Sequence, residues 1–338
     1  MKTSRFSFDL PEELIAQEPV KDRESARMLA LDRSTGATED LTVRDLPRKL
    51  APGTLVVVND SRVRKARLFG GGADGRSLEV LLLARRSDGR WEALVGGAHK
   101  AKTGRKFDFP DGVIGTVEAA EGEVRIVAFR PEVDDAYLEK HGHVPLPPYI
   151  KRPDTQTDAE EYQTVYARVM GSAAAPTAGL HLTPRLMAEL EARGIGIAYV
   201  TLHVGLGTFL PIRSEEIEDH VMHVERYSIP ERTVGMVEDA RRGGRRILAV
   251  GTTTVRTLES AWRDGTPGPG EGSTGMYIRP GHRFRVVNAL FTNFHTPRSS
   301  LLVLVSAFAG AEAIAGAYQE AVRKRYRFFS YGDAMVIL

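Results

Sequence analysis

A long β-rich stretch interrupts a chain that otherwise alternates strands and helices, and this interruption limits the folds open to it. Between residues 63 and 150, short apolar runs recur at intervals of roughly 8–12 residues, which is typical of a small β-barrel or sandwich. After residue 150, strands alternate with helices, which implies a mostly parallel sheet. We therefore expect an α/β domain formed by residues 1–62 and 151–338, carrying a small β-barrel domain inserted at residues 63–150.

The elements of the α/β domain are predicted from apolar runs and capping residues. Thr183 has the hydroxyl of an N-cap for a helix over 184–193, with Pro184 at the first helical position. The other expected helices are 11–18, 231–243, 255–262, 299–309 and 311–324, the expected strands are 54–58, 195–202, 246–250 and 286–292, and residues 264–275 are expected to form a flexible loop.

Composition excludes several classes of protein. The chain has no cysteine, which rules out disulfides, thiolate metal sites and cysteine nucleophiles. The formal net charge of +2 argues against a protein that coats nucleic acid. A net charge near zero is still compatible with a local basic surface that binds nucleic acid. The first residues lack the apolar run of a signal peptide, and the apolar run at 300–309 is about half a membrane span. We expect a cytoplasmic protein with no membrane partner.

Four polar clusters follow predicted strands. Ligands of open α/β sheets bind beyond the carboxyl ends of the strands, so the coincidence of four clusters indicates one shared site. Each cluster alone is also explained by ordinary turn chemistry. The clusters are 59–62 (NDSR), 203–208 (HVGLGT), 251–256 (GTTTVR) and 293–297 (NFHTP).

The cluster at 251–256 has a specific chemical meaning. It lies between a strand and a helix, where free backbone N–H groups and hydroxyls hold a carboxylate or phosphate oxygen. It lacks the glycine and lysine of a P-loop, and no Gly-x-Gly-x-x-Gly follows a strand. The sequence therefore predicts an anion site without nucleoside-triphosphate or dinucleotide chemistry.

Histidines supply the candidates for proton transfer near neutral pH, namely His181, His203 and His295. His220 and His223 with Glu225 have a second interpretation as metal ligands. Their spacing differs from the His-Glu-x-x-His of zinc proteases, so hydrogen-bonded histidines are the favoured interpretation and no metal is expected.

Three basic runs suit contacts with RNA, because phosphate binding needs local density of positive charge. The last run also interleaves aromatic residues that would stack on bases. Solvated surface explains the first two runs equally well, and packing of the last helix explains the third. The runs are 61–67 (SRVRKAR), 149–152 (YIKR) and 323–331 (RKRYRFFSY).

Stretches along nearly the whole chain, in order, resemble one family, the S-adenosylmethionine:tRNA ribosyltransferase-isomerases of queuosine synthesis. Together they are highly specific. They include 7–10 (SFDL), 59–68 (NDSRVRKARL), 145–150 (PLPPYI), 162–166 (YQTVY), 174–181 (AAPTAGLH), 200–209 (VTLHVGLGTF), 217–223 (IEDHVMH), 249–260 (AVGTTTVRTLES), 291–295 (FTNFH), 303–310 (VLVSAFAG) and 326–335 (YRFFSYGDAM).

The resemblance implies an α/β domain with an inserted β-barrel and an unusual use of S-adenosylmethionine. The ribosyl carbons move to the aminomethyl group of 7-aminomethyl-7-deazaguanine at the tRNA wobble position. The products are epoxyqueuosine-tRNA, adenine and methionine. This chemistry needs a base beside the sulfonium carbon, a neutral acceptor amine and an acid that protonates adenine. S-Adenosylmethionine is then a co-substrate, with no true cofactor, and we expect a monomer.

The resemblance also suggests roles for individual residues. The candidates for acid and base are His203, His181, His295, Glu225 and Asp333. The methionine carboxylate is assigned to Thr252, Thr253 and Arg256, since arginine suits a bidentate grip. Sugar and base contacts are assigned to Asn59, Arg62 and Asn293, and the remaining residues expected at the S-adenosylmethionine site are Gly179, Gly205 and Thr208.

Three alternatives stay open at this point. An S-adenosylmethionine-dependent methyltransferase would use the same ligand, and release of adenine and methionine would exclude it. A non-catalytic RNA-binding or scaffolding protein would show no turnover. A metal-dependent hydrolase built on His220, His223 and Glu225 would lose activity with a chelator.

Overall fold

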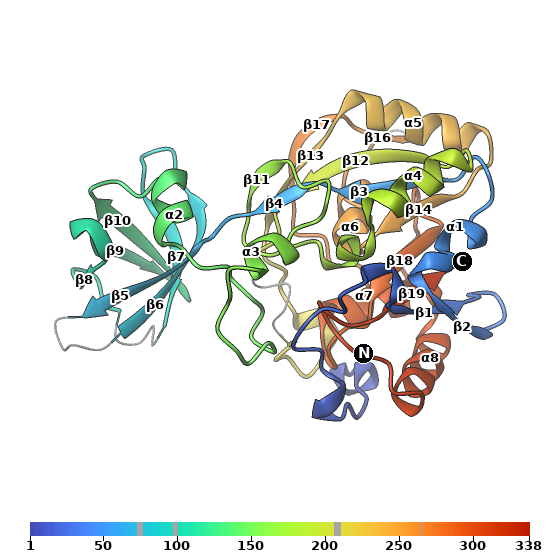
Figure 1. Ribbon diagram of the computed structural model, residues 1–338, viewed down its shortest axis with the longest axis horizontal. Helices are drawn as coiled ribbons and strands as arrows, with labels where there is room; N and C mark the ends of the chain where they lie inside the picture. The colour runs from blue at the N-terminus through green and yellow to red at the C-terminus, as the bar shows by residue number, and fades with distance from the viewer. Residues whose placement is uncertain (73–76, 97–100, 206–210, 264) are drawn as a thin grey trace.

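The protein consists of two bodies joined by a narrow connection (Figure 1). The computed structural model describes residues 1–72, 77–96, 101–205, 211–263 and 265–338. The larger body is built on a nine-stranded sheet, and the smaller one is a closed barrel of six strands. This arrangement confirms the predicted α/β fold with an inserted β-barrel.

The large sheet is mixed, and its centre is parallel. Four neighbouring strands, β12, β3, β14 and β18, run parallel to one another, and antiparallel strands extend the sheet on both sides. In spatial order the strands are β17 (Gly270–Thr274), β13 (Glu225–Ile229), β12 (Gly196–Leu202), β3 (Leu55–Asn59), β14 (Ile247–Val250), β18 (Ala289–Asn293), β19 (Ala334–Ile337), β1 (Arg27–Leu31) and β2 (Thr38–Thr42).

Strand β3 shows why the strands at the centre of the sheet are continuous runs of apolar residues. All five of its residues are buried, because helices cover both faces. Leu55 and Val57 contact one core, and Val56 and Val58 contact the other. The first core includes α5 (Glu231–Arg242), α6 (Thr252–Ser260), α7 (Ser300–Ala309) and α8 (Ala311–Arg323), and the second includes α1 (Leu46–Lys49) and α4 (Pro184–Ala192).

The barrel closes around its own core, in which Trp91 donates its indole N–H to the Val133 carbonyl (3.1 Å). The two chain segments that enter and leave the barrel pair with each other at Arg67 and His143. The barrel strands are β5 (Arg67–Gly72), β6 (Ser77–Arg85), β7 (Trp91–Val95), β8 (Lys106–Asp108), β9 (Ile114–Glu121) and β10 (Val124–Arg130), followed by helix α2 (Asp135–His141).

Short elements connect the two bodies (Figure 1). Strand β4 precedes the barrel and pairs in parallel with β11, which follows it. A separate core around Tyr162 and Tyr331 packs beneath this connection. The remaining short elements are β4 (Ser61–Val63), α3 (Asp158–Glu161), β11 (Val169–Ser172), β15 (Trp262–Arg263) and β16 (Thr266–Pro267).

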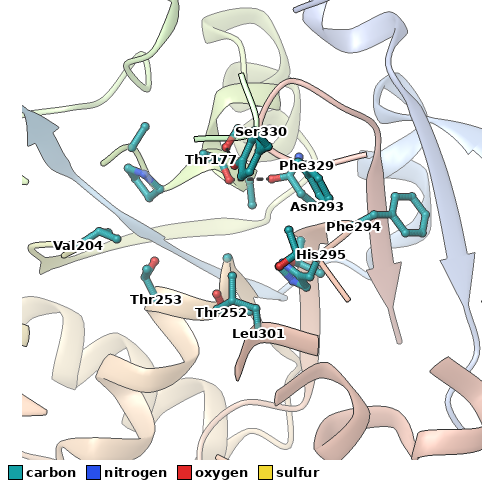
Figure 2. A pocket seen from close by; sticks show the side chains of 17 residues that line it. Thr177, Val204, Thr252, Thr253, Asn293, Phe294, His295, Leu301, Phe329 and Ser330 are labelled. Atoms are coloured by element: carbon teal, nitrogen blue, oxygen red, sulfur yellow. Dashed lines mark hydrogen bonds between the residues drawn. The ribbon is translucent and has the colours of Figure 1, made fainter. Parts of the chain in front are cut away.

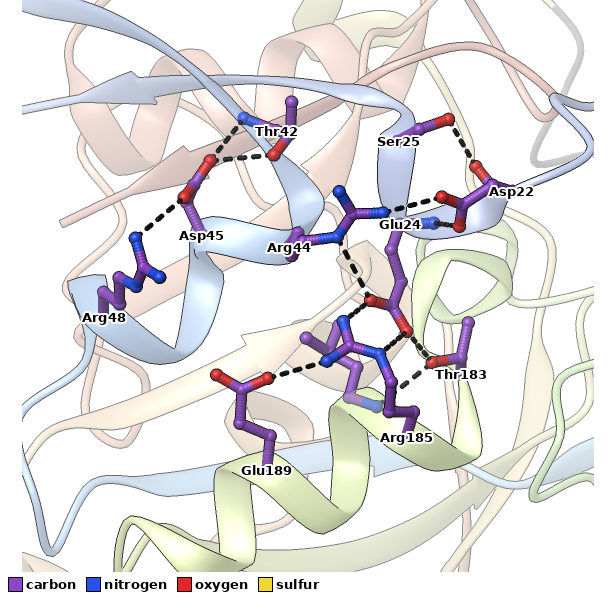
Figure 3. A network of polar contacts seen from close by, with 11 residues as sticks. Asp22, Glu24, Ser25, Thr42, Arg44, Asp45, Arg48, Thr183, Arg185 and Glu189 are labelled. Atoms are coloured by element: carbon purple, nitrogen blue, oxygen red, sulfur yellow. Dashed lines mark hydrogen bonds and ion pairs between the residues drawn. The ribbon is translucent and has the colours of Figure 1, made fainter.

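Thr183 is the N-cap of α4, as predicted. Its hydroxyl accepts the backbone N–H of Leu186 (3.1 Å) and also contacts the buried carboxylate of Glu24. Arg185 in the first turn donates to the same carboxylate (3.1 Å). Figure 3 shows that this network ties the start of α4 to the N-terminal segment.

Two predicted elements are wrong. Residues 11–18 contain only the 3₁₀ turn Glu12–Leu14, because Ala16 donates its backbone N–H to the Phe328 carbonyl (3.3 Å) and draws the segment into an extended pairing. The loop expected at 264–275 includes strand β17, which pairs with β13. Residue 264 lies outside the described residues.

Among the described residues, no helix by itself has the length and apolar composition to cross a membrane. Helices α7 and α8 meet that test only as a pair, and they bend by 116° between them.

Candidate functional site

A pocket of about 560 Å³, its open mouth included, lies at the carboxyl ends of the central strands (Figure 2). Three of the four predicted strand-end clusters contribute to it. The lining comprises Tyr149, Ala175, Pro176, Thr177, Ala178, Val204, Gly251, Thr252, Thr253, Thr292, Asn293, Phe294, His295, Thr296, Leu301, Phe329 and Ser330.

The start of α6 forms one side of the pocket. The helix begins at Thr252, earlier than the predicted 255, after Gly251 turns the chain at φ +85°. Thr254 points its hydroxyl back to the Val250 carbonyl (2.8 Å), whereas Thr252 and Thr253 line the pocket. The first N–H groups of a helix lack internal partners, so this end suits an anionic group.

Asn293 lines the pocket in a fixed orientation. Its Oδ1 accepts from the Thr177 hydroxyl (3.1 Å), and its Nδ2 lies 3.1 Å from Nε2 of His181. His181 is outside the described lining, on the far side of this amide. Burial lowers the pKa of His181 to about 3, and the charge of Arg23 adds to the effect. The imidazole is therefore neutral near pH 7 and positions Asn293.

His295 is the one predicted proton-transfer residue in the described lining. Its Nε2 lies 3.0 Å from the Thr292 hydroxyl, and its backbone N–H donates to the Tyr318 hydroxyl (2.9 Å). Burial lowers the pKa of His295 to about 3. The imidazole is therefore neutral near pH 7 and can accept a proton from a bound molecule, but burial also makes it a weaker base than an exposed histidine.

His203 lies outside the described lining, although Val204 next to it belongs to that lining. Its imidazole packs against Gly171, where a Cβ would come within 3.0 Å of the ring. Burial lowers the pKa of His203, and the charge of Arg64 lowers it further. Of the three predicted histidines, the structure therefore places only His295 in the described lining.

Glu225 and Arg256 pair with each other rather than facing the pocket. Their ion pair is buried, and Arg256 also donates from Nε to the Met276 carbonyl (3.2 Å). Glu225 accepts the backbone N–H of Gly205 (2.8 Å). The pair thus connects β13 and α6 to the chain that follows β12.

Asp333 closes the loop between α8 and β19 and is also outside the described lining. Its two carboxylate oxygens accept the backbone N–H groups of Arg27 (2.9 Å) and Arg327 (2.7 Å). Burial raises the pKa of Asp333 despite these bonds. Asp333 therefore shapes the loop that carries Phe329 and Ser330 to the pocket.

Asn59 is completely buried beneath the pocket. Its Oδ1 accepts the backbone N–H of Leu202 (3.0 Å), and its Nδ2 donates to the Leu202 carbonyl (3.0 Å). Nδ2 also lies 3.4 Å from the Thr253 hydroxyl. Asn59 therefore holds the ends of β3 and β12 together and supports Thr253.

The other residues predicted for the S-adenosylmethionine site are dispersed. Arg62 is exposed on β4 and lines a separate hollow between the two bodies. Gly179 lies in the 3₁₀ helix Thr177–His181, packed against the Tyr166 hydroxyl. Thr208 lies outside the described residues.

The described residues contain no group of three or more His, Asp or Glu able to hold a metal ion. His220 packs edge-to-face on the ring of Tyr277 (5.3 Å), and Glu225 pairs with Arg256. The metal interpretation of His220, His223 and Glu225 therefore has no support in this part of the chain.

Sequence reasoning missed the aromatic part of the pocket. Tyr149 and Phe329 line it with ring centroids 4.6 Å apart, and the Tyr149 hydroxyl lies 2.5 Å from the Ser330 hydroxyl. Both residues fall in runs that sequence alone associated with RNA. All the aromatic residues of 323–331 are packed, as the alternative interpretation of that run required: Tyr326, Phe328, Phe329 and Tyr331 are buried.

Similarity to known proteins extends over the whole chain. The sequence model of a family described as "Queuosine biosynthesis protein" matches residues 3–337. Proteins named S-adenosylmethionine:tRNA ribosyltransferase-isomerase from Treponema denticola and Geobacter metallireducens are 50% and 49% identical, over 100% of both chains in each case.

A crystal structure is also similar. That of S-adenosylmethionine tRNA ribosyltransferase from Thermotoga maritima is 38% identical, with 99% of this chain and 100% of that chain covered and a TM-score of 0.57. Both the sequence and the structure thus match one group of proteins from end to end. The chain therefore belongs to the queuosine biosynthesis protein family.

Proposed function

We propose that this protein is an S-adenosylmethionine:tRNA ribosyltransferase-isomerase. It transfers and isomerises the ribosyl part of S-adenosylmethionine onto the aminomethyl group of 7-aminomethyl-7-deazaguanine at the tRNA wobble position. The products are epoxyqueuosine-tRNA, adenine and methionine. The observation that carries the proposal is identity of about half of all residues, over the full length, to relatives of that name.

The character of the pocket supports S-adenosylmethionine as the ligand. Among the described lining residues there is no aspartate, glutamate, lysine or arginine. A sulfonium ion bound there would have no carboxylate partner. It would therefore keep its full acidifying effect on the neighbouring C–H bonds. Thr252, Thr253 and the first N–H groups of α6 would bind the methionine carboxylate. This assignment replaces Arg256, whose guanidinium is taken by Glu225.

His295 is our first candidate for the general base. It lines the pocket, it is neutral near pH 7, and Thr292 fixes its ring. The proton that it accepts would come from the carbon next to the sulfonium. His181 acts through Asn293 and is a positioning residue in this scheme. Asn293 and Thr177 would hydrogen-bond the sugar or the base.

We further propose that the protein works as a cytoplasmic monomer, with no cofactor besides its two substrates. Light scattering of the purified protein with and without tRNA tests the oligomeric state. Addition of a chelator before the reaction tests the absence of a metal, and full retention of turnover is the expected result.

Product analysis tests the reaction. Purified protein, S-adenosylmethionine and tRNA carrying the aminomethyl-deazaguanine base should release adenine and methionine in equal amounts. Release of S-adenosylhomocysteine would identify a methyltransferase instead. No turnover with tRNA binding intact would favour a non-catalytic RNA-binding protein.

Turnover of histidine variants tests the acid–base assignment. His295→Ala should lower kcat by about 100- to 10,000-fold, the usual worth of a general acid or base. His203→Ala, outside the described lining, should have a smaller effect. Near-normal rates for both variants would refute proton transfer by these residues.

A further inference from the structure

Two aromatic residues, Phe329 and Tyr149, line the pocket as well as packing on the hydrophobic core. Of the aromatic residues in 323–331, Phe329 alone belongs to the described lining. Its ring also borders a second, outer hollow that includes Phe8 and Leu10. Phe329 belongs to the main hydrophobic core of the large body, and it also lies between the pocket and the outer hollow.

The backbone holds Phe329 in an unusual conformation. Its φ is +72°, in the left-handed region that residues with side chains rarely adopt. Its N–H donates to the Phe294 carbonyl (3.2 Å), and its carbonyl accepts from Gly332 (3.0 Å). Asp333 closes the same loop through Arg327. Strained residues of this kind cluster at ligand sites, where the surrounding structure fixes them.

Tyr149 completes the wall from a different part of the chain. Its ring centroid lies 4.6 Å from that of Phe329, with the two planes inclined by 50°. Its hydroxyl bonds with that of Ser330 (2.5 Å), so the same loop fixes both rings. Hydrogen-bonding side chains lie beside the rings, at Thr177, Asn293 and Ser330.

The two sides of the pocket have different chemistry. Figure 2 shows Phe329 and Ser330 across the pocket from Thr252 and Thr253 at the start of α6. One side suits an anion, and the other offers apolar ring faces edged by polar groups. A ligand with a carboxylate at one end and a flat nitrogen heterocycle at the other matches this division.

We propose that Phe329 and Tyr149 form the stacking surface for a purine-type heterocycle, with Thr177, Asn293 and Ser330 at its polar edge. This inference rests on the proposed function. Two substrates of that reaction carry such a ring: S-adenosylmethionine through its adenine, and the tRNA through its deazaguanine. Stacking of a base on an aromatic side chain is sequence-tolerant and strong enough to position a ring.

The test compares Phe329→Asn, Phe329→Leu and Phe329→Tyr with wild type. Asparagine accepts the left-handed backbone better than phenylalanine but lacks the ring, so Phe329→Asn removes the stacking surface without adding strain. Phe329→Tyr retains the ring and should retain function. Phe8→Leu removes an aromatic side chain from the outer hollow and is the matched control. Thermal unfolding establishes that each variant is folded.

Calorimetric titration with S-adenosylmethionine alone distinguishes the two rings. If adenine is the occupant, Phe329→Asn and Phe329→Leu should raise its Kd by about 5- to 150-fold, with Phe329→Tyr and Phe8→Leu near wild type. If deazaguanine is the occupant, that Kd stays unchanged and the KM for modified tRNA rises instead. Folded Phe329→Asn with wild-type Kd and KM would overturn the inference. Failure of the proposed function is distinct: wild type would then release no adenine.

Discussion

Glu225 and Arg256 form an ion pair in which each side chain is only 3% exposed. The two residues come from different elements, since Glu225 begins β13 and Arg256 lies in α6. Glu225 also accepts the N–H of Gly205, and Arg256 donates to the Met276 carbonyl. The pair therefore holds three chain segments around the start of α6, the proposed carboxylate site.

Breaking this pair from one side should be costly for stability. Glu225→Gln leaves the Arg256 guanidinium buried without its counter-charge, which typically costs about 3–5 kcal/mol. Urea unfolding should show the loss as a lower midpoint. The double variant Glu225→Leu with Arg256→Met removes both charges and should lose less. A midpoint for Glu225→Gln equal to that of wild type would refute a structural role for the pair.

The buried histidines should make the protein sensitive to acid. The pKa of His181 and the pKa of His295 are both lowered from 6.5 to about 3 by burial. Between pH 6.5 and pH 3, these imidazoles bind protons in the unfolded chain and not in the folded protein. Their contribution to the free energy of unfolding is therefore fully present above about pH 6.5 and is lost as the pH falls toward 3. Each imidazole should contribute a slope of about 1.4 kcal/mol per pH unit.

Unfolding measurements at several pH values test this dependence. His295→Gln should reduce the slope of unfolding free energy against pH below pH 6.5, by an amount equivalent to at most one proton. The control His223→Gln replaces an exposed side chain and should retain the wild-type slope. An unchanged slope in both His181→Gln and His295→Gln would show that other groups cause the acid sensitivity.

Local sequence predicted the elements whose stability is local. The apolar run of β3, the Thr183 cap of α4 and the strand-to-helix turn at Gly251 all depend on neighbouring residues. The general rule that ligands bind at strand ends then predicted one site for all four clusters, and three of the four line the pocket. Fold class and the location of the pocket were therefore accessible from the sequence.

The direction of individual side chains was not accessible. Arg256 follows Thr252 and Thr253 and resembles a carboxylate ligand, but its partner Glu225 comes from strand β13, far from it in the sequence. Asn59 is the last residue of β3, yet its amide is used by the backbone of Leu202. Phe329 gave no local sign of its place in the pocket, because Asp333 and Phe294 set its conformation. Such roles depend on tertiary partners.

Arg62 should contribute to tRNA binding and not to S-adenosylmethionine binding. It is exposed on β4, and among the described residues no acidic side chain pairs with it. Neighbouring Arg64 and Lys65 pair with Asp135 (2.7 Å) and Glu139 (2.5 Å), so their charge is partly neutralised. Arg62→Ala should weaken tRNA binding and reduce the slope of log K against log salt by about 1.

Filter binding at several salt concentrations measures this slope. Lys65→Ala is the matched control and should change it less. The Kd for S-adenosylmethionine should be the same in wild type and Arg62→Ala, because Arg62 lies outside the described lining of the pocket. If Arg62→Ala changes that Kd and leaves tRNA binding unaltered, Arg62 contacts S-adenosylmethionine, as the sequence suggested, and not the tRNA.

Gly179 should tolerate no side chain while Tyr166 keeps its hydroxyl. A Cβ at Gly179 would lie 2.0 Å from that oxygen and 2.8 Å from Cγ2 of Thr164. Gly179→Ala should therefore destabilise the protein by about 1–3 kcal/mol and shift Thr177 in the pocket. Among the described residues the Tyr166 hydroxyl has no hydrogen-bond partner, so Tyr166→Phe alone should be nearly neutral. The double variant should recover part of the lost urea midpoint, since only the Thr164 contact and the ring remain. If Gly179→Ala unfolds at the wild-type midpoint, or Tyr166→Phe gives no recovery, the close approach is not what requires glycine.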